Sequence, residues 1–239
     1  MTSSATTSPA SRVAPERPAA GTILAHRPGW LPPDDVLAKH FGDVSRYPYY
    51  RLQLTQYLAR LLPERGACSL IDVGAGDGTL GGVFRNWRPD TTVVGVETFV
   101  RDERWMTGAI PMVRFDGRRL PFADRSFDVA LLSNVLHHTG DQLAVLREVC
   151  RVTRGTVIIK DHLSRNLFDR WRLAFLDVMG NLRFGASTTG EYLSDAQWAA
   201  MFRAVGARKV HRYDALSFRT GLLERAFGNH LEIIFALEL

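Results

Sequence analysis

Cysteine is scarce in this sequence, which has 239 residues and only Cys68 and Cys150. Both cysteines lie beside or within apolar segments, and their spacing fits no metal-binding pattern. Two cysteines also give no framework for a disulfide-stabilised fold. We therefore expect both to be small core residues. We expect no metal site either, because the sequence shows no cluster of metal-ligating residues.

Long apolar runs are also missing. None approaches the roughly 20 residues that a helix needs to cross a bilayer, so we expect no membrane span. Residues 1–22 are rich in Ser, Thr, Ala and Pro, and they lack the apolar central stretch of a secretory signal. The sequence thus predicts a disordered tail at 1–22 and a cytoplasmic protein.

Lysine is nearly absent, since Lys39, Lys160 and Lys209 are the only lysines among 30 basic residues. The net charge of +5 and the isoelectric point of about 9.5 would suit an acidic partner such as nucleic acid. The arginines, however, are scattered and form no dense basic run. Because a polyanion site normally shows as a local cluster of positive charge, we do not expect a nucleic-acid partner.

What the chain does contain is an ordinary globular mixture, with 46% hydrophobic and 23% charged residues. The length suits one domain, which we place at 23–239. Residues 23–66 predict amino-terminal helices. From residue 67 onward, short apolar runs alternate with helical stretches, a pattern typical of a parallel sheet with crossover helices.

Five apolar or β-branched runs predict the strands of a core at 67–162. They are Ser69–Val73, Thr92–Val96, Met112–Phe115, Phe127–Leu132 and Thr156–Lys160. Helices are expected between them at Leu80–Trp87, Arg101–Gly108 and Asp141–Val152.

The remaining chain divides into two parts. Residues 163–193 predict an amphipathic helical insertion that either covers a pocket as a lid or packs on the core. Residues 194–239 predict a closing helix and two closing strands. These lie at Asp195–Val205, His211–Ala215 and Leu231–Leu239.

The sharpest feature is the segment Ser69–Leu80, which reads SLIDVGAGDGTL. A buried strand runs into a turn with three glycines and then into an apolar helix, and ligands of open α/β sheets bind at such carboxyl ends. The G-x-G-x-G spacing differs from the G-x-G-x-x-G fingerprint of dinucleotide sites. Asp72 and Asp77 would repel a pyrophosphate, whereas carboxylates suit a cationic ligand.

This turn resembles motif I of the class I S-adenosylmethionine-dependent methyltransferases, and the resemblance covers about residues 70–161. Glu97 ends the second strand, and Asp116 and Gly117 follow the third. Residues 120–122 and 126–128 match the family's "LPF…SFD" stretch. Residues 135–138 match the "vLHH" run of the UbiE-like, small-molecule branch, also called methyltransferase type 11.

The resemblance implies a Rossmann-like α/β fold with a doubly wound sheet of seven strands, mostly parallel with an antiparallel last strand. It implies S-adenosylmethionine as the cofactor, with Glu97 on the ribose hydroxyls and Asp116 on the adenine amine. The expected cofactor-binding residues are Asp72, Gly74, Ala75, Gly76, Glu97, Asp116, Gly117 and Asn134.

The candidate catalytic residues are His137 and His138, which stand at the carboxyl end of the fourth strand. An acceptor hydroxyl or acidic carbon would lose its proton most readily to a base with a pKa near neutrality. Histidines here could equally cap the following helix or pack structurally. Asp161, His162, Tyr49 and Tyr50 rank below this pair.

The acceptor is expected to be a small molecule, because the chain lacks the Asn/Asp-Pro-Pro-Tyr motif of many enzymes that methylate amino groups. Methylation could occur on oxygen, carbon or nitrogen. One alternative is a non-methylating protein on this scaffold, such as a cyclase or a binding module. Another is an RNA methyltransferase, and a nicotinamide oxidoreductase ranks third. The sequence leaves a homodimer open.

Overall fold

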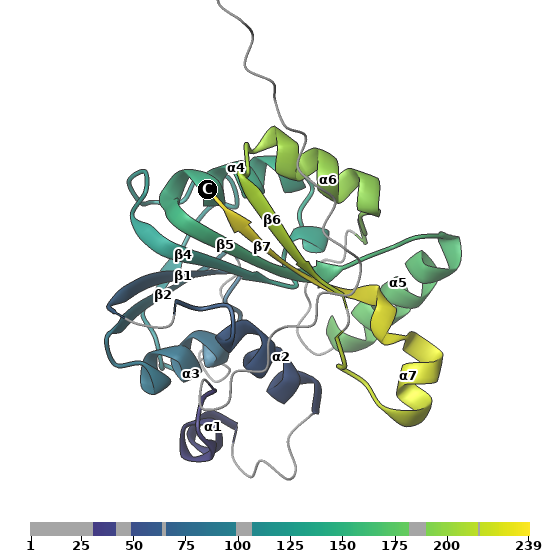
Figure 1. Cartoon of the computed structure of the whole chain (residues 1–239), viewed down its shortest axis with the longest axis horizontal. Helices are drawn as coiled ribbons and strands as arrows, with labels where there is room; N and C mark the ends of the chain where they lie inside the picture. The colour runs from purple at the N-terminus through teal and green to yellow at the C-terminus, as the bar shows by residue number, and fades with distance from the viewer. Residues whose placement is uncertain (1–30, 42–48, 64–65, 99–106, 182–189, 215) are drawn as a thin grey trace, which may run out of the picture.

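The structure is a computed structural model that describes residues 31–41, 49–63, 66–98, 107–181, 190–214 and 216–239. Within these residues, one sheet has the strand order β3-β2-β1-β4-β5-β7-β6 (Figure 1). Neighbouring strands are parallel, except that β7 runs antiparallel to β5 and β6. The strands are β1 (Cys68–Val73), β2 (Thr91–Glu97), β3 (Met112–Arg114), β4 (Phe127–Ser133), β5 (Thr153–His162), β6 (Lys209–Tyr213) and β7 (Glu232–Glu238). The predicted α/β, doubly wound sheet with an antiparallel last strand is confirmed.

Helices cover both faces of this sheet (Figure 1). One face carries α1 (Asp34–Phe41), α2 (Tyr49–Ala59) and α3 (Thr79–Trp87). The other carries α4 (Gln142–Val152) and α6 (Asp195–Ala204), while α5 (Leu167–Asn181) and α7 (Gly221–Phe227) lie beyond the edge where β5 ends. The sequence predicted α3, α4 and α6 to within about one residue at each end.

The alternation of side chains along β1 divides the core into two layers. Leu70 belongs to the layer beneath α1, α2 and α3, and Ile71 and Val73 belong to the layer beneath α4 and α6. The first layer includes Leu37, Leu58, Val83, Phe84, Val129 and Ile158, and the second includes Leu146, Val149, Val157, Trp198, Phe202 and Phe235. Burial of both faces explains why the central strands are continuous apolar runs.

The strand order reverses beside β1, and this reversal locates the expected ligand crevice. From β1 the chain proceeds outward through β2 and β3 on one side, and later through β4 and β5 on the other. Ligands of open α/β sheets bind outside the carboxyl ends of the strands at such a reversal. The glycine-rich turn follows β1 at this point.

Some elements differ from the expectations. β5 begins at Thr153 rather than Thr156, and the short helix α7 was not predicted. The predicted tail at 1–22 and most of the predicted helix at Arg101–Gly108 lie outside the described residues. Among the described helices, none combines the length and the apolar character needed to cross a bilayer.

The orientation of the helix in the insertion also differs from the prediction. The sequence assigned the apolar stripe of 163–193 to the pocket or the core. In the structure, Leu167, Trp171 and Met179 are 83%, 63% and 56% exposed, and among the described apolar side chains of α5 only Leu173 is fully buried. Asp169 and Asp177 are buried instead. The helix α5 thus turns carboxylates inward and most of its apolar side chains outward.

Candidate functional site

The turn after β1 is built so that backbone can approach a ligand closely. Gly74 donates its N–H to the carbonyl oxygen of Val96 at 2.8 Å and has a φ of +69°. A Cβ at this position would lie 2.6 Å from the Val135 side chain. Both the left-handed backbone and the close packing therefore require glycine here. Gly78, with a φ of +80°, then starts α3.

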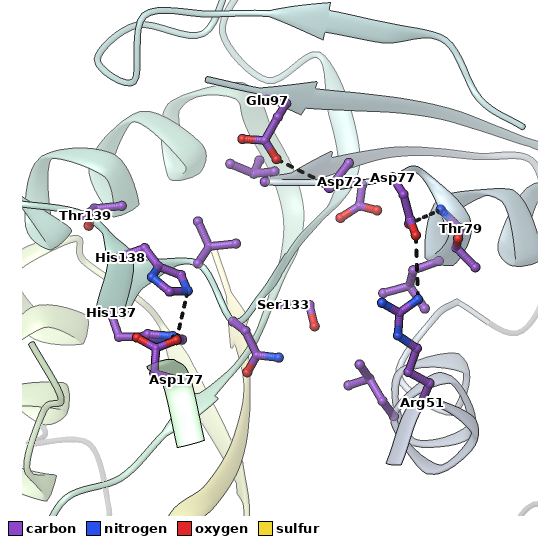
Figure 2. A pocket seen from close by; sticks show the side chains of 18 of the residues that line it. Arg51, Asp72, Asp77, Thr79, Glu97, Ser133, His137, His138, Thr139 and Asp177 are labelled. Carbon is purple, nitrogen blue, oxygen red and sulfur yellow. Dashed lines mark hydrogen bonds and ion pairs between the residues drawn. The ribbon is translucent and has the colours of Figure 1, made fainter. Parts of the chain in front are cut away.

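Three carboxylates surround this turn (Figure 2). Asp72 is 1% exposed, and its Oδ2 has no hydrogen-bond partner among the described residues. Burial raises the pKa of Asp72 to about 7, and the charges of Glu97 and Asp77 add to the rise. Glu97 accepts a hydrogen bond from the N–H of Gly76 at 3.1 Å. A buried oxygen without a partner, beside two further carboxylates, suits a ligand that is cationic or donates hydrogen bonds.

Asp116, a predicted cofactor-binding residue, lies at the surface. Its Oδ1 accepts hydrogen bonds from the N–H groups of Arg118 and Arg119, at 2.8 and 2.9 Å. These bonds hold the pKa of the Asp116 carboxyl below its usual value. The neighbours Phe115 and Gly117 line the cavity, whereas Asp116 is exposed and does not. Its predicted contact with adenine therefore stays a prediction.

One cavity of about 900 Å³ joins the turn to a group of histidines. Its lining includes seven of the eight predicted cofactor residues, Asp116 being the exception. At the other end it is lined by His137, His138 and Asp177 (Figure 2), and also by His162. A volume of this size holds a cofactor or drug-sized molecule.

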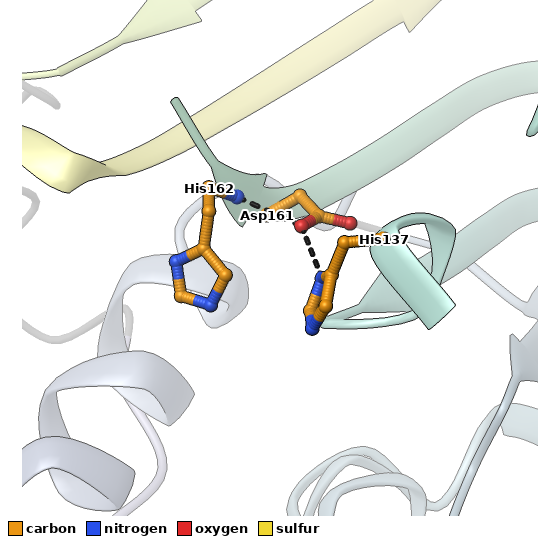
Figure 3. A group of neighbouring side chains, drawn as sticks. All are labelled: His137, Asp161 and His162. Atoms are coloured by element: carbon orange, nitrogen blue, oxygen red, sulfur yellow. Dashed lines mark hydrogen bonds and ion pairs between the residues drawn. The ribbon is translucent and has the colours of Figure 1, made fainter. Parts of the chain in front are cut away.

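His137 and Asp161 form a buried pair at this second end. His137 lies in the short 3-10 turn Leu136–His138 that follows β4, and Asp161 lies near the end of β5. The Nδ1 of His137 is 2.5 Å from Oδ1 of Asp161, and the two side chains are 3% and 2% exposed (Figure 3). Asp161 also accepts bonds from the N–H groups of Leu136 and His162. This arrangement fixes the plane and the tautomer of the His137 ring.

Asp177 lies on the other side of the same ring. Its Oδ1 is 3.8 Å from Nε2 of His137 and 3.6 Å from Nε2 of His138, and Tyr192 donates its hydroxyl to Oδ2 at 3.3 Å. Burial lowers the pKa of His137, but the charges of Asp161 and Asp177 outweigh burial and raise it to about 9. The sequence did not single out Asp177, because a carboxylate within an apolar helical stretch normally marks the solvent side.

The grouping of these side chains also bears on the expectation of no metal site. Ligand atoms of His137, Asp161 and His162 lie within 4.8 Å of one another, and so do those of His137, His138 and Asp177. Either group has the residue types that hold a transition metal. The sequence did not show these groups, because the 3-10 turn after β4, the end of β5 and α5 each contribute to them.

Asn134 is fixed at the floor of the cavity by a buried network. It has a φ of +58° and donates from Nδ2 to the Tyr50 hydroxyl at 3.3 Å. Lys160 donates to the same hydroxyl at 2.6 Å and to Oδ1 of Asn134. Lys160 Nζ is also 2.5 Å from Glu232, which is 2.6 Å from Arg219. Because the network reaches Asn134 from α2, β5 and β7, no local sequence pattern reveals it.

Comparison with known proteins gives relatives of different activities. The chain is 31% identical over 150 residues to 27-O-demethylrifamycin SV methyltransferase of Amycolatopsis mediterranei, covering 54% of this chain and 55% of the relative. It is 28% identical over 123 residues to tRNA (carboxymethyluridine(34)-5-O)-methyltransferase of Schizosaccharomyces pombe, covering 52% of this chain and 50% of the relative. The chain thus spans about half the length of these curated relatives.

A solved structure shares the fold. The [4+2]-cyclase SpnF superposes with a TM-score of 0.57 at 15% identity, over 86% of this chain and 91% of that one. A family model described as a methyltransferase domain matches residues 46–212. Together with the glycine turn and the acidic cavity, this match shows that the chain belongs to the S-adenosylmethionine-dependent methyltransferase family.

Proposed function

We propose that this chain transfers a methyl group to a hydroxyl or acidic carbon of a small molecule, and that His137 takes up the proton. The observation that carries the proposal is the continuity of the cavity. One end has the glycine turn with Asp72 and Glu97, and the other has the His137–Asp161 pair. A donor and an acceptor bound in one cavity are held in position to react with each other.

The residues around the turn fit S-adenosylmethionine. The unpartnered Oδ2 of Asp72 and the carboxylates of Asp77 and Glu97 favour a molecule with an ammonium and a sulfonium. Gly74 lines the cavity and has no Cβ, so its backbone can lie against the ligand. When bound, S-adenosylmethionine supplies an electrophilic methyl group and leaves as a neutral thioether.

The surroundings of His137 support its proposed role as the acceptor of the proton. Asp161 holds the Nδ1 side of the ring, so Nε2 lies on the side of Asp177, which also lines the cavity. A pKa of about 9 favours the imidazolium at neutral pH. A sulfonium in the same cavity would repel that cation and lower its pKa, so cofactor binding would favour the neutral, proton-accepting form. Asp161 then stabilises the imidazolium that forms.

The proposal is tested by incubating the full chain with methyl-labelled S-adenosylmethionine and a panel of small hydroxylated aromatics and polyketides, with tRNA as a parallel substrate. Transfer of label to a small molecule, with release of S-adenosylhomocysteine, supports the proposal. Labelling of tRNA alone would assign an RNA acceptor, in line with the tRNA-methylating relative. Cofactor binding without transfer to any acceptor would point to a non-methylating role, as the fold shared with SpnF allows.

The two predicted acidic cofactor contacts should differ in effect. Glu97→Ala is expected to weaken S-adenosylmethionine binding by about 1–3 kcal/mol, since it removes a carboxylate that lines the cavity and holds the Gly76 N–H. Asp116→Ala is expected to leave the affinity nearly unchanged, because Asp116 is exposed and already caps its own turn. Calorimetric titration measures both. Equal affinities for the wild type and Glu97→Ala would overturn the ribose assignment.

Treatment with a chelator tests whether the histidines take part in proton transfer or bind a metal ion. Because we assign Nε2 of His137 to the acceptor's proton, we expect treatment with EDTA followed by gel filtration to leave kcat unchanged. The measurement is the initial rate of methyl transfer before treatment, after treatment and after adding back Mg²⁺, Mn²⁺ or Zn²⁺. A rate that falls with EDTA and returns with one metal would assign the groups around His137 to that metal instead.

A further inference from the structure

The outward face of α5 has a pattern that the cofactor and acceptor sites do not explain. Successive residues of a helix are rotated by about 100°, so α5 can be divided into sectors around Trp171. The exposed sector contains Leu167, Phe168, Trp171, Ala174, Phe175, Val178 and Met179. The opposite sector contains the buried side chains of Asp169, Leu173 and Asp177.

Aromatic stacking extends this apolar face over α7. The rings of Phe168, Trp171 and Phe175 follow one another at 6.1 Å in stacked geometry, and Phe227 stacks on Phe175 at 5.9 Å. We call the exposed sector of α5 together with Phe227 the outer apolar face. A contiguous face of large aromatic and aliphatic side chains normally marks an interaction site.

Along α5, the charges that border the outer apolar face are positive, whereas α7 adds one exposed charge of each sign, Glu224 and Arg225. Arg170 and Arg172 fall about 100° on either side of Trp171 and so flank the apolar sector along both of its edges. The guanidinium of Arg172 lies 4.3 Å from the centre of the Phe168 ring. No carboxylate of the described residues forms an ion pair with these three arginines, and Asp169 and Asp177 are turned inward.

We propose that the outer apolar face docks on the surface of an anionic lipid bilayer. A central apolar stripe with Trp, Phe and Leu, bordered on both sides by arginine, is the arrangement of helices that lie in the plane of the interface. The rings and alkyl chains enter the acyl boundary, and the flanking guanidinium groups reach lipid phosphates. If two copies of the chain instead associated through this face, their arginines would be brought together and would repel one another.

Docking would place the wall of the cavity at the membrane surface, a consequence that rests on the proposed function. Leu176 and Asp177 line the cavity from the inner side of α5, while Phe175 and Val178 belong to the outer face. One helix therefore separates the bilayer from the acceptor end of the cavity. We infer that the acceptor is an amphiphile that partitions into bilayers, with its reactive hydroxyl or acidic carbon at the polar end.

Sedimentation with vesicles tests the docking. The full chain is expected to bind vesicles containing phosphatidylglycerol and phosphatidylcholine, to bind pure phosphatidylcholine weakly, and to dissociate as salt rises. Arg170→Gln and Arg172→Gln should each lower the partition coefficient about fivefold. Trp171→Ser combined with Phe175→Ser should abolish binding. Arg147→Gln, a change at an exposed arginine on α4, is the matched control and should have no effect.

Three outcomes would overturn the docking. The first is no vesicle binding by the wild type. The second is equal loss in Arg147→Gln and Arg170→Gln, which would show dependence on net charge alone. The third is a dimer in light scattering that Trp171→Ser dissociates, since a second copy would then cover the face. Affinity for S-adenosylmethionine, measured calorimetrically in the same variants without vesicles, should be unchanged, so a failed docking is distinguishable from a failed cofactor assignment.

Discussion

Replacing Asp161 by Asn is expected to lower kcat by about 10²- to 10⁴-fold while leaving S-adenosylmethionine binding nearly unchanged. The asparagine would keep the size of the side chain but lose the charge that stabilises the His137 imidazolium. An amide in this position could also present its N–H₂ to Nδ1 and so favour the wrong ring tautomer. Single-turnover rates with saturating cofactor, together with a calorimetric titration, measure the two effects separately.

The pH profile provides the control for this prediction. Because the pKa of His137 is about 9 without cofactor, the neutral base becomes more abundant as the pH rises toward 9, and kcat/KM of the wild type, which reports the free enzyme, should rise with it. Stability should change in the opposite sense. A pKa raised from about 6.5 stabilises the fold fully below pH 6.5, and this contribution is lost as the pH rises through 9. A rate in Asp161→Asn that equals the wild-type rate at every pH would remove His137 from proton transfer.

Replacing Glu232 by Gln is expected to lower the free energy of unfolding by about 3–5 kcal/mol. Lys160 and Glu232 are both 0% exposed, and Glu232 also pairs with Arg219. Glutamine would leave the ammonium of Lys160 buried with no anion beside it. Urea denaturation followed by circular dichroism measures the change, provided that the m-value stays constant.

The same substitution elsewhere on β7 is the matched control. Glu238 is 49% exposed and pairs with His211 and Lys209, so Glu238→Gln is expected to cost less than about 1 kcal/mol. The double change Lys160→Met with Glu232→Gln should recover part of the loss, because it removes the unpaired charge. Equal losses for Glu232→Gln and Glu238→Gln would show that the buried pair has no special weight in stability.

The central sheet was predictable because its signals are local. A strand buried on both faces contains a continuous apolar run, as in Val129–Leu132 of β4, and the glycine turn follows from the backbone that it requires at Gly74. The helix α7 was missed for the converse reason. It has seven residues, begins at a glycine and is mostly exposed, so no apolar period identifies it.

The candidate site was predictable at the end that a contiguous motif encodes. Asp72, Gly74 and Glu97 stand at strand ends, where the chain order itself places them together. The acceptor end depends on contacts between distant segments. Asp177 reaches His137 only because α5 turns its carboxylates inward, and Lys160 finds Glu232 only after β7 pairs with β5. Such pairings depend on packing, which pattern and propensity do not describe.

The position of β7 has a consequence for the order of folding. Among the described strands, β6 pairs only with β7, and β7 lies between β6 and β5. In a nascent or truncated chain that ends before Glu232, β6 therefore lacks the strand with which it pairs. The hydrogen-bonding edge of β5 is then exposed. Exposed edges of this kind recruit strands from other molecules. Residues 209–238 should thus acquire protection from hydrogen exchange together and late, while β1, β2 and β4 form an earlier cooperative unit.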